Sequence, residues 1–394
     1  MEFERVSNKM KSSWPLNVSN FNLLDRLKIA LFVLNSKNFW TMNKKVQEFE
    51  IKMAAFADVK HAIFVANGSV ANTLIAMNLK DNYKGKKTII FPSTTWVTSV
   101  SPFIREGFKP KFIDISLNDF CLDLDKTEEY LKRYHKNVCC IFITSLLGFV
   151  PDINRLKEIT AKYNVKIMMD NCENTFGQYG GKNISSFFTS TTSTYFGHQL
   201  QSVEGGFVFT NDDSERDYFL MARNHGMTRS LVNNSKYLNP QVDSKFDFYL
   251  LGNNFRNSDI HAFIGLLDFN RVKEYISNRK KLYSLFANTL DAEKYIIAKE
   301  SDERTHIAFC LPIVFKNSNP EKLKKALQYC NDNKIETRPI ISGNLLRQTC
   351  FSKYEDYKAY ENSEFIHQNG FYIGLHNKLS EDQIETVTSY LNEL

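Results

Sequence analysis

Short apolar runs alternate with segments of helical spacing along the first half of the chain. The apolar runs predict β-strands, and segments whose apolar positions recur every three to four residues predict α-helices. Strands are expected at 60–66, 86–92, 110–115, 138–146 and 165–170, helices at 68–80, 94–107 and 152–164, and two further strands at 185–196 and 205–212. Such alternation predicts an α/β fold on a largely parallel, doubly wound sheet.

The pattern changes after about residue 270. The sequence predicts one long helix at 271–291, a strand at 305–315, a helix at 320–333, a strand at 335–340 and a final helix at 380–394. We therefore expect two domains: an N-terminal arm with a large α/β domain over residues 1–270, and a smaller α+β domain over residues 271–394.

Composition and charge are those of an ordinary globular protein. Of 394 residues, 43% are hydrophobic and 24% are charged. The formal net charge is only +6 and no run of five basic residues occurs, so nucleic acid is not an expected partner. The longest apolar stretches, such as residues 29–34, are far too short to span a membrane. The N-terminal residues have no apolar core like that of a signal peptide.

The seven cysteines are odd in number and form no C-x-x-C pair. They are expected to be free thiols in a reducing compartment, which places the protein in the cytoplasm. The eight histidines are scattered, so no metal site is expected. Phosphate-loop, dinucleotide-binding, H-E-x-x-H and G-x-S-x-G motifs are all absent. An enzyme with this sequence would need another kind of cofactor, or none.

The first candidate segment, residues 67–72, follows a predicted strand and reads Asn-Gly-Ser-Val-Ala-Asn. Small residues at a helix N-terminus let backbone N–H groups approach a phosphate. An ordinary strand–helix turn capped by Ser69 would have the same sequence. This segment alone does not decide between the two readings.

The second candidate segment runs from Asp170 to Glu173, at the end of a predicted buried strand. Ligands of open α/β sheets lie at those strand ends. Burying an acid there is costly without a cationic partner, and a protonated pyridine nitrogen would be one. A helix-capping Asp is the alternative.

Two further polar segments lie at 193–206 and 252–256. The first contains His198 and ends in Glu204-Gly-Gly, and the second reads Gly-Asn-Asn-Phe-Arg. A lone histidine in a loop usually has no chemical role, but the Glu-Gly-Gly sequence gives this one context.

In this order and spacing, the four segments resemble the DegT/DnrJ/EryC1/StrS family of nucleotide-sugar aminotransferases, from about Trp14 to the C-terminus. The resemblance implies the aspartate aminotransferase fold (fold type I), with pyridoxal 5′-phosphate or pyridoxamine 5′-phosphate as cofactor. Gly68, Ser69 and Ser193 would hold the cofactor phosphate. Asn254 would cross a homodimer interface to the neighbouring subunit's phosphate.

The resemblance also assigns the residues around the cofactor ring. Trp96 would stack on the pyridine ring. Asp170 would pair with the ring nitrogen and so keep the cofactor an electron sink. Glu173 would contact the phenolic oxygen or the amine.

One departure from the family pattern decides the expected function. His198 stands where the family has the lysine that holds the cofactor covalently, and no lysine occurs between Lys182 and Lys236. An imidazole cannot form that link, but it moves protons near neutral pH. The chain would therefore work with pyridoxamine phosphate bound non-covalently, as in the subgroup of nucleotide-sugar 3-dehydratases.

In that subgroup, His198 would take a proton from the cofactor's aminomethyl carbon and protonate the departing 3-hydroxyl group. The implied substrate is GDP-4-keto-6-deoxymannose, and L-glutamate would restore the amine. A related CDP-sugar branch that carries an iron–sulfur cluster is disfavoured, because the cysteines here are not clustered. Candidate substrate contacts, each of which could instead be structural, are His225, Arg229, Arg338 and His376.

Two alternatives stay open. An ordinary sugar aminotransferase would use another lysine or none, and would release an amino sugar. A catalytically inactive homologue would bind a nucleotide sugar without turning it over. Asp170, Trp96 and Ser193 favour a working cofactor site.

Overall fold

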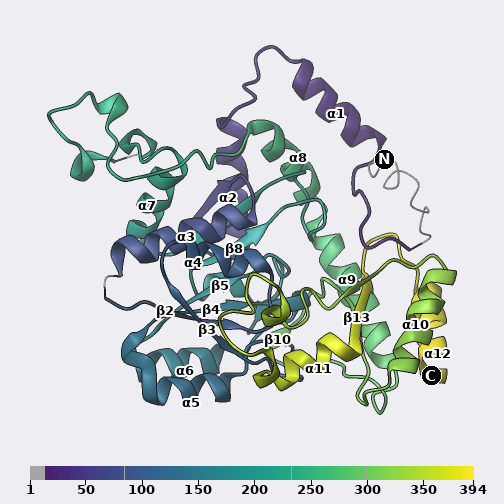
Figure 1. Ribbon diagram of the computed structural model, residues 1–394. Helices are drawn as coiled ribbons and strands as arrows, with labels where there is room; N and C mark the ends of the chain where they lie inside the picture. The colour runs from purple at the N-terminus through teal and green to yellow at the C-terminus, as the bar shows by residue number, and fades with distance from the viewer. Residues whose placement is uncertain (1–13, 84, 232, 299) are drawn as a thin grey trace, which may run out of the picture.

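A seven-stranded sheet lies at the centre of the molecule (Figure 1), in a computed structural model that describes residues 14–83, 85–231, 233–298 and 300–394. Strand β9 runs antiparallel to both of its neighbours, and the remaining strand pairs are parallel. In spatial order the strands are β1 (His61–Val65), β9 (Gly206–Thr210), β8 (Ser190–Ser193), β5 (Lys166–Asp170), β4 (Val138–Thr144), β2 (Thr88–Pro92) and β3 (Lys109–Ile113). The largely parallel α/β sheet predicted from the sequence is confirmed.

Helices cover both faces of this sheet. One layer consists of α3 (Gly68–Asn82), α4 (Ser101–Arg105) and α7 (Asp213–Arg223), and the other of α5 (Leu124–Tyr134) and α6 (Ile153–Tyr163). In the fully buried β4, Cys140 and Phe142 pack into the first layer, and Ile141 and Ile143 pack into the second. A strand buried on both faces must be apolar at every position, which explains its unbroken apolar run. Helices α2 (Lys44–Ala57) and α8 (Asp259–Phe269) pack beside β1 and β9.

The residues after 270 build a second core around a small antiparallel sheet. Its order is β11 (Cys310–Val314), β13 (Gly370–Gly374) and β12 (Thr337–Pro339). The helices of this region are α9 (Val272–Thr289), α10 (Pro320–Asp332), α11 (Glu361–Asn369) and α12 (Glu381–Glu393). A third small sheet joins β10 (Arg304–Thr305), β6 (Gln178–Tyr179) and β7 (Lys182–Asn183).

The two cores are not separate along the chain. Leu345, Leu346, Phe351 and Tyr360 return from the second half to pack into the core of the large sheet. Trp14 near the N-terminus packs into the second core. The division into domains after residue 270 therefore stays a prediction, and the first 13 residues of the predicted arm lie outside the described residues.

Three predicted elements are shorter in the structure than in the sequence analysis. The helix expected at 94–107 is reduced to a 3₁₀ turn (Val97–Ser99) and the five-residue α4, because Thr94 and Thr95 donate or accept side-chain hydrogen bonds across the core instead. The strand expected at 185–196 is only β8. The strand expected at 305–315 is only β11, preceded by the two-residue β10.

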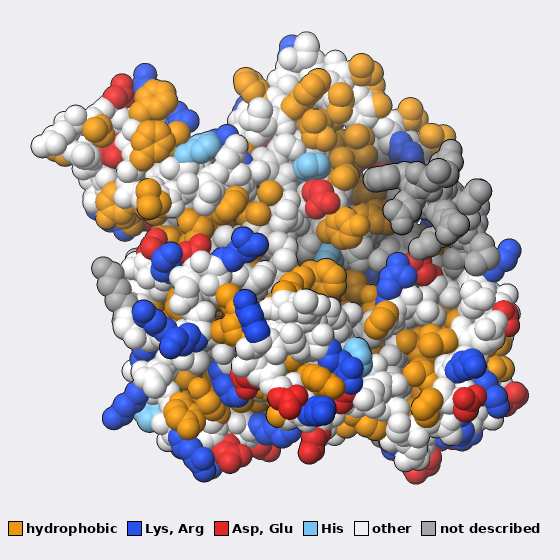
Figure 2. Space-filling model, viewed as in Figure 1, with side chains coloured by type: hydrophobic (Ala, Val, Ile, Leu, Met, Phe, Trp, Pro, Cys, Tyr) orange, Lys and Arg blue, Asp and Glu red, His pale blue; other side chains and the backbone are white. Residues whose placement is uncertain are grey.

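Two segments expose several large apolar side chains each, and apolar atoms gather on the corresponding parts of the face in Figure 2. One is helix α1 (Leu23–Leu34), where five leucines are exposed. The other is the arm formed by residues 225–231 and 233–256, which projects from the body beyond α7 (Figure 1). Its Phe246, Phe248 and Tyr249 are exposed, and Leu251 is 94% exposed. Among the described residues, no helix has the length and apolar character needed to cross a membrane.

Candidate active site

A cavity of about 540 Å³ opens where three neighbouring strands of the large sheet end. Thr144, Asp170 and Ser193, the last residues of β4, β5 and β8, all line it. This is the edge at which open α/β sheets bind ligands. The structure brings eight of the twelve predicted site residues to this cavity: Gly68, Ser69, Trp96, Asp170, Glu173, Ser193, His198 and Arg338.

Asp170 lies on the cavity floor and is held only by neutral donors. Its side chain is 3% exposed. Oδ2 accepts hydrogen bonds from Asn72 Nδ2 at 2.8 Å and Ser99 Oγ at 2.7 Å, and Oδ1 accepts one from the Cys172 N–H at 3.0 Å. No basic side chain of the described residues forms an ion pair with it. A buried carboxylate without a basic neighbour is costly, and a positively charged group of a ligand would offset that cost.

The N-terminus of α3 forms a second wall of the cavity. Asn67, and not Ser69, caps the helix, because its side chain accepts the Val70 N–H at 2.9 Å. A Cβ atom on Gly68 would stand 2.8 Å from Cys172 Sγ and 3.0 Å from Ser193 Cβ, so only glycine fits there. Free N–H groups of a helix N-terminus beside Ser193 form a setting that favours a phosphate.

His198 occupies the loop between β8 and β9 and is half-buried against aromatic rings. Its ring centroid lies 5.6 Å from that of Phe309 and 6.2 Å from that of Tyr195. Burial lowers the pKa of the imidazole to about 4, with Arg279 adding to this effect and Asp170 opposing it. The ring is therefore neutral at physiological pH and available as a base. Nδ1 is buried without a hydrogen-bond partner among the described atoms.

The residues that line this cavity include no lysine. Among the described residues, these walls therefore carry no side-chain amine, at the position of His198 or elsewhere.

Glu173 follows Asp170 on the same turn and is almost fully buried. Its Oε2 accepts the Leu147 N–H at 2.7 Å. Burial raises the pKa of this carboxyl to about 8, an effect that the Leu147 bond reduces and the charge of Asp170 increases. The side chain is thus mostly protonated at neutral pH and can donate a hydrogen bond to a ligand oxygen or nitrogen.

Trp96 and Arg338 lie at the more open part of the cavity. The Trp96 side chain is 54% exposed, which leaves its indole face free to stack on a planar ligand. Arg338, on β12, forms an ion pair with Glu336 at 2.9 Å.

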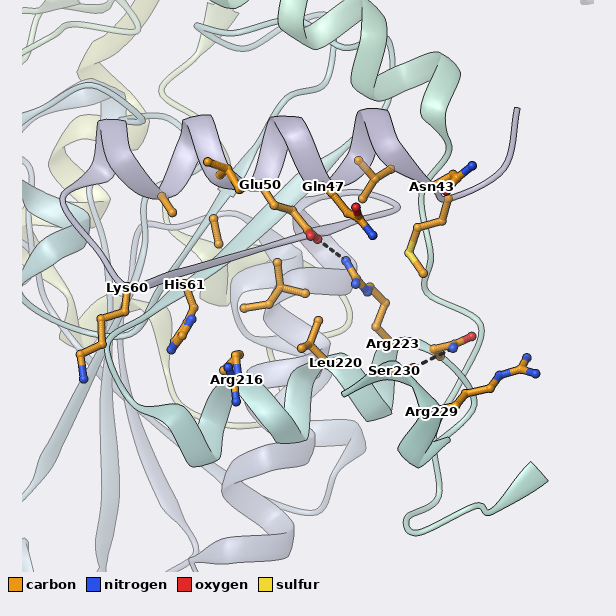
Figure 3. Close-up of a pocket in the computed structure, with 17 residues that line it drawn as sticks. Asn43, Gln47, Glu50, Lys60, His61, Arg216, Leu220, Arg223, Arg229 and Ser230 are labelled. Carbon is orange, nitrogen blue, oxygen red and sulfur yellow. Dashed lines mark hydrogen bonds and ion pairs between the residues drawn. The ribbon is translucent and has the colours of Figure 1, made fainter. Parts of the chain in front are cut away.

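Three predicted site residues, His225, Arg229 and Asn254, lie outside this cavity on the projecting arm. Asn254 forms a β-bridge with Asn224, and the His225 N–H donates to the Asn253 carbonyl at 2.8 Å, so they share one local structure. Arg229 instead lines a second cavity, of about 740 Å³, between α2 and α7 (Figure 3). Inside that cavity the figure shows the ion pair between Arg223 and Glu50.

The fourth residue outside the cavity, His376, is buried below it. The Lys378 N–H donates to its Nδ1 at 3.3 Å, and Nε2 has no partner among the described atoms. Burial lowers the pKa of this ring to about 4, and Arg279 adds to the effect.

Sequence reasoning missed several residues that shape the cavity, notably Asn72, Ser99, Phe309 and Tyr372. Asn72 carried a visible signal. It is a polar residue on the buried face of a helix that otherwise presents residues such as Leu74 and Ile75. Such a position usually indicates a side chain with a specific partner, and here the partner is Asp170.

Comparison with known proteins adds three findings. Residues 25–392 match the DegT/DnrJ/EryC1/StrS aminotransferase family. The GDP-4-keto-6-deoxy-D-mannose 3-dehydratase of Escherichia coli O55:H7 is 29% identical, over 97% of this chain and 99% of the relative. The solved structure of an E. coli enzyme of that name with bound hydrated PLP has a TM-score of 0.89 and 27% identity, and the match covers 97% of this chain and all of that one.

A second solved structure of such a dehydratase contains trapped PLP joined to glutamate. It has a TM-score of 0.88 and 27% identity, over 96% of this chain and 100% of the other. The likeness thus extends along nearly the whole chain.

Proposed function

Because the chain belongs to the DegT/DnrJ/EryC1/StrS aminotransferase family, we propose that it is a nucleotide-sugar 3-dehydratase that uses pyridoxamine phosphate and acts on GDP-4-keto-6-deoxymannose. The observation that carries this proposal is the cavity itself, where a neutral histidine and no lysine stands beside a buried carboxylate. The relatives of that name support the choice of substrate. The PLP-dependent aspartate aminotransferase fold expected from the sequence is confirmed.

The residues of the cavity fit the proposed cofactor. Asp170 has only neutral donors and would balance a protonated pyridine nitrogen. The N-terminus of α3, with the close approach at Gly68 and with Ser193, would hold the phosphate. Trp96 would stack on the ring. With no lysine on these walls, the cofactor would be held by non-covalent contacts alone.

Bound pyridoxamine phosphate supplies an electron sink next to the sugar ketone. His198 does the proton transfer: its ring lines the cavity and would take a proton from carbon and then deliver one to the oxygen of the departing 3-hydroxyl. A base that turns into an acid within one turnover contributes roughly 10²–10⁴-fold in rate. Glu173, protonated, donates a hydrogen bond to the cofactor's phenolic oxygen or amine.

We propose that the three site residues on the arm serve the other subunit's cavity. Asn254 is exposed on the arm, and His225 and Arg229 belong to the same structure, so all three would reach a cofactor phosphate or substrate across a homodimer interface. The exposed apolar residues of the arm support burial against a second copy. Arg338 would contact the substrate within its own subunit, and His376 would act on substrate indirectly, from below the cavity.

The proposal also covers the second substrate, the location and the domains. L-Glutamate would return the amine to the cofactor, as the glutamate-bound relative suggests. All seven cysteines are free, which fits the reducing cytoplasm. The large domain would end at residue 270, where α8 has finished and before α9 begins.

The test is incubation of the purified chain with GDP-4-keto-6-deoxymannose, pyridoxamine phosphate and glutamate, followed by mass spectrometry. We expect a sugar lighter by one oxygen atom, with one equivalent each of ammonia and 2-oxoglutarate per turnover. A product that keeps its hydroxyls and gains nitrogen would instead identify an aminotransferase. Binding of the nucleotide sugar without any product would identify an inactive homologue.

A further inference from the structure

A buried arginine lies directly behind the wall of the active-site cavity. Arg279, in the middle of α9, has a side chain that is 5% exposed. Its Nη1 donates to the carbonyl oxygens of Ala308 at 3.0 Å and Phe309 at 3.2 Å, and its Nε has no partner. No carboxylate of the described residues forms an ion pair with it. A buried unpaired charge costs several kcal/mol, so its presence calls for a reason.

The two carbonyls belong to a short strap, Ile307–Phe309, that is fixed from three sides. Gln199, the neighbour of His198, donates its Nε2 to the Ile307 carbonyl at 2.5 Å. The Phe309 N–H donates to the Leu147 carbonyl at 2.8 Å. The Leu147 N–H in turn donates to Glu173. The strap therefore joins α9 to both the His198 loop and the Glu173 carboxyl.

The strap has no freedom to shift toward its neighbours. A Cβ on Gly148 would stand 2.4 Å from the Ile307 carbonyl oxygen and 2.5 Å from the Phe309 nitrogen. Phe309 in turn presents its ring to the cavity, 5.6 Å from the His198 ring. The position of the imidazole therefore depends on where the strap lies, and the strap depends on Arg279.

We propose that Arg279 is a positioning residue of this active site: its guanidinium clamps the strap against the His198 loop and holds an uncompensated positive charge behind that imidazole. The inference rests on the proposed role of His198 in proton transfer. A fixed cation at this place disfavours a second positive charge on the ring, so the base stays unprotonated between turnovers. Arg279 holds the strap and places a positive charge near the ring, and both effects act through His198. The guanidinium itself does not line the cavity.

Other charges around the two residues bear on the test. Those that face His198 from the cavity walls are Asp170, Glu173, Tyr195, Glu204, Arg338 and Tyr372. Arg279 also interacts electrostatically with Cys310 and His376, and His376 with Lys378. Asp170 favours protonation of His198, in opposition to Arg279. All of these groups stay in place in the variants below, so a changed titration of His198 is assignable to Arg279.

Two variants separate the effect of the positive charge from the effect of the hydrogen bonds to the strap. Arg279→Met keeps an unbranched apolar stem but removes the charge and the donors. Arg279→Lys keeps the charge, but its ammonium ends about one bond short of the position of Nη1, the atom that donates to both strap carbonyls. Arg223→Met controls for the loss of a buried arginine: Arg223 is equally buried and also donates to a carbonyl oxygen, that of Phe64, but it pairs with Glu50 and belongs to α7, away from this cavity.

The first measurement is an NMR titration of the histidine rings in the full chain without cofactor, with the His198 signal assigned by its loss in His198→Asn. In Arg279→Met the titration midpoint of His198 should rise by about one pH unit, since one unit is the usual scale of a nearby charge. It should stay in place in Arg279→Lys and in Arg223→Met. An unmoved midpoint in Arg279→Met would overturn the electrostatic role. This measurement needs no substrate, so it is independent of the proposed reaction.

The second measurement is the pH profile of dehydration. Arg279→Lys should keep the acid limb of kcat/KM where it is, while kcat falls about tenfold because the shorter side chain no longer reaches both strap carbonyls. Arg279→Met should lose at least as much kcat and move the acid limb to higher pH. If Arg223→Met lowers kcat equally, or if Arg279→Lys behaves as the wild-type chain, the positioning role is wrong.

Discussion

Three ionisable side chains around one cavity, Asp170, Glu173 and His198, differ because their surroundings differ. Asp170 receives three hydrogen bonds from neutral donors. Glu173 receives one and is otherwise desolvated, so the pKa of its carboxyl rises to about 8. The pKa of His198 falls to about 4 for the same reason. The site thus pairs a fixed anion with a neutral acid and a neutral base.

Replacement of His198 by asparagine tests the base. His198→Asn should lower the dehydration rate by about 10²-fold or more, because no other group on the cavity walls is placed to move both protons. Cofactor binding, followed by absorbance and equilibrium dialysis, should stay within about twofold, because the phosphate and ring contacts lie elsewhere. His61→Asn, a change to a surface histidine paired with Asp213, is the control. Full activity in His198→Asn would mean that another residue transfers the proton.

The raised pKa of Glu173 predicts that the free energy of unfolding depends on pH between pH 6.5 and 8. The folded chain keeps this proton up to a pKa of about 8, whereas the unfolded chain has lost it above its ordinary pKa of 4.5. The folded state then binds more protons, so the free energy of unfolding falls as the pH rises through this window, by about 1–2 kcal/mol. The buried histidines act in the opposite direction near pH 6.5, because the unfolded chain still binds protons at its ordinary histidine pKa of 6.5 while His198 and His376 are neutral in the folded chain. The contribution of Glu173 is therefore read from the difference between the wild-type chain and a variant that lacks this carboxyl.

Glu173→Gln should remove this contribution, because glutamine is neutral at every pH. Urea unfolding at pH 6.5, 7.2 and 8 measures it. Parallel curves for the two chains would show that Glu173 is ionised in the folded protein over the whole range.

At the scale of elements, the N-terminus of α3 is built for a close approach that any side chain would block. Gly68→Ala places a methyl group 2.8 Å from Cys172 Sγ and 3.0 Å from Ser193 Cβ. We expect pyridoxamine phosphate to bind at least tenfold more weakly, because the wall that faces the phosphate is displaced. Equilibrium dialysis measures the change.

A second substitution provides the control for the first. Cys172→Ala removes the nearer obstacle, so the double variant Gly68→Ala/Cys172→Ala should recover part of the lost affinity. If the double variant binds no better than Gly68→Ala alone, the loss has another cause than this contact.

The sequence predicted those elements whose apolar pattern matches their burial. The ends of strand β4 and helix α6 were predicted within about two residues. Every residue of β4 is buried and one face of α6 is buried, so the apolar pattern of each matches its burial. Helix α1 gave no such signal, since Leu23, Leu24 and Leu27 face outward. The strap at 307–309 has a strand-like sequence, but Arg279, Gln199 and the Leu147 turn take its hydrogen bonds, and only the folded chain brings these together.

The site was predictable where chemistry depends on local sequence. Asp170 at a strand end and His198 before Glu-Gly-Gly both line the cavity, and their chemical roles stay predictions. Arg279 was overlooked although it breaks an apolar stripe on α9 formed by Tyr275, Leu282 and Phe286. A charge within a buried helix face is a signal that a pattern analysis can use, because burial of that charge is costly unless it has a partner.

At the scale of the whole molecule, the predicted site residues on the arm do not line the cavity of their own chain. Eight predicted site residues line the cavity, while His225, Arg229 and Asn254 stay on the projecting arm. One chain therefore does not assemble the whole predicted site. A symmetric dimer in which each arm reaches the other cavity would assemble it twice.

Mixed dimers test this arrangement directly. His198→Asn and Asn254→Ala should each be nearly inactive alone. After the two chains are mixed, unfolded and refolded together, half of the dimers are mixed, and each mixed dimer holds one site with an intact His198 and the partner's intact Asn254. Activity should return to about a quarter of the wild-type value if the sites are shared between subunits. If Asn254 serves the cavity of its own chain, every site in every dimer carries one of the two defects, and mixing restores nothing. Light scattering on the same samples checks the dimer, and a fully active monomer would contradict the shared site.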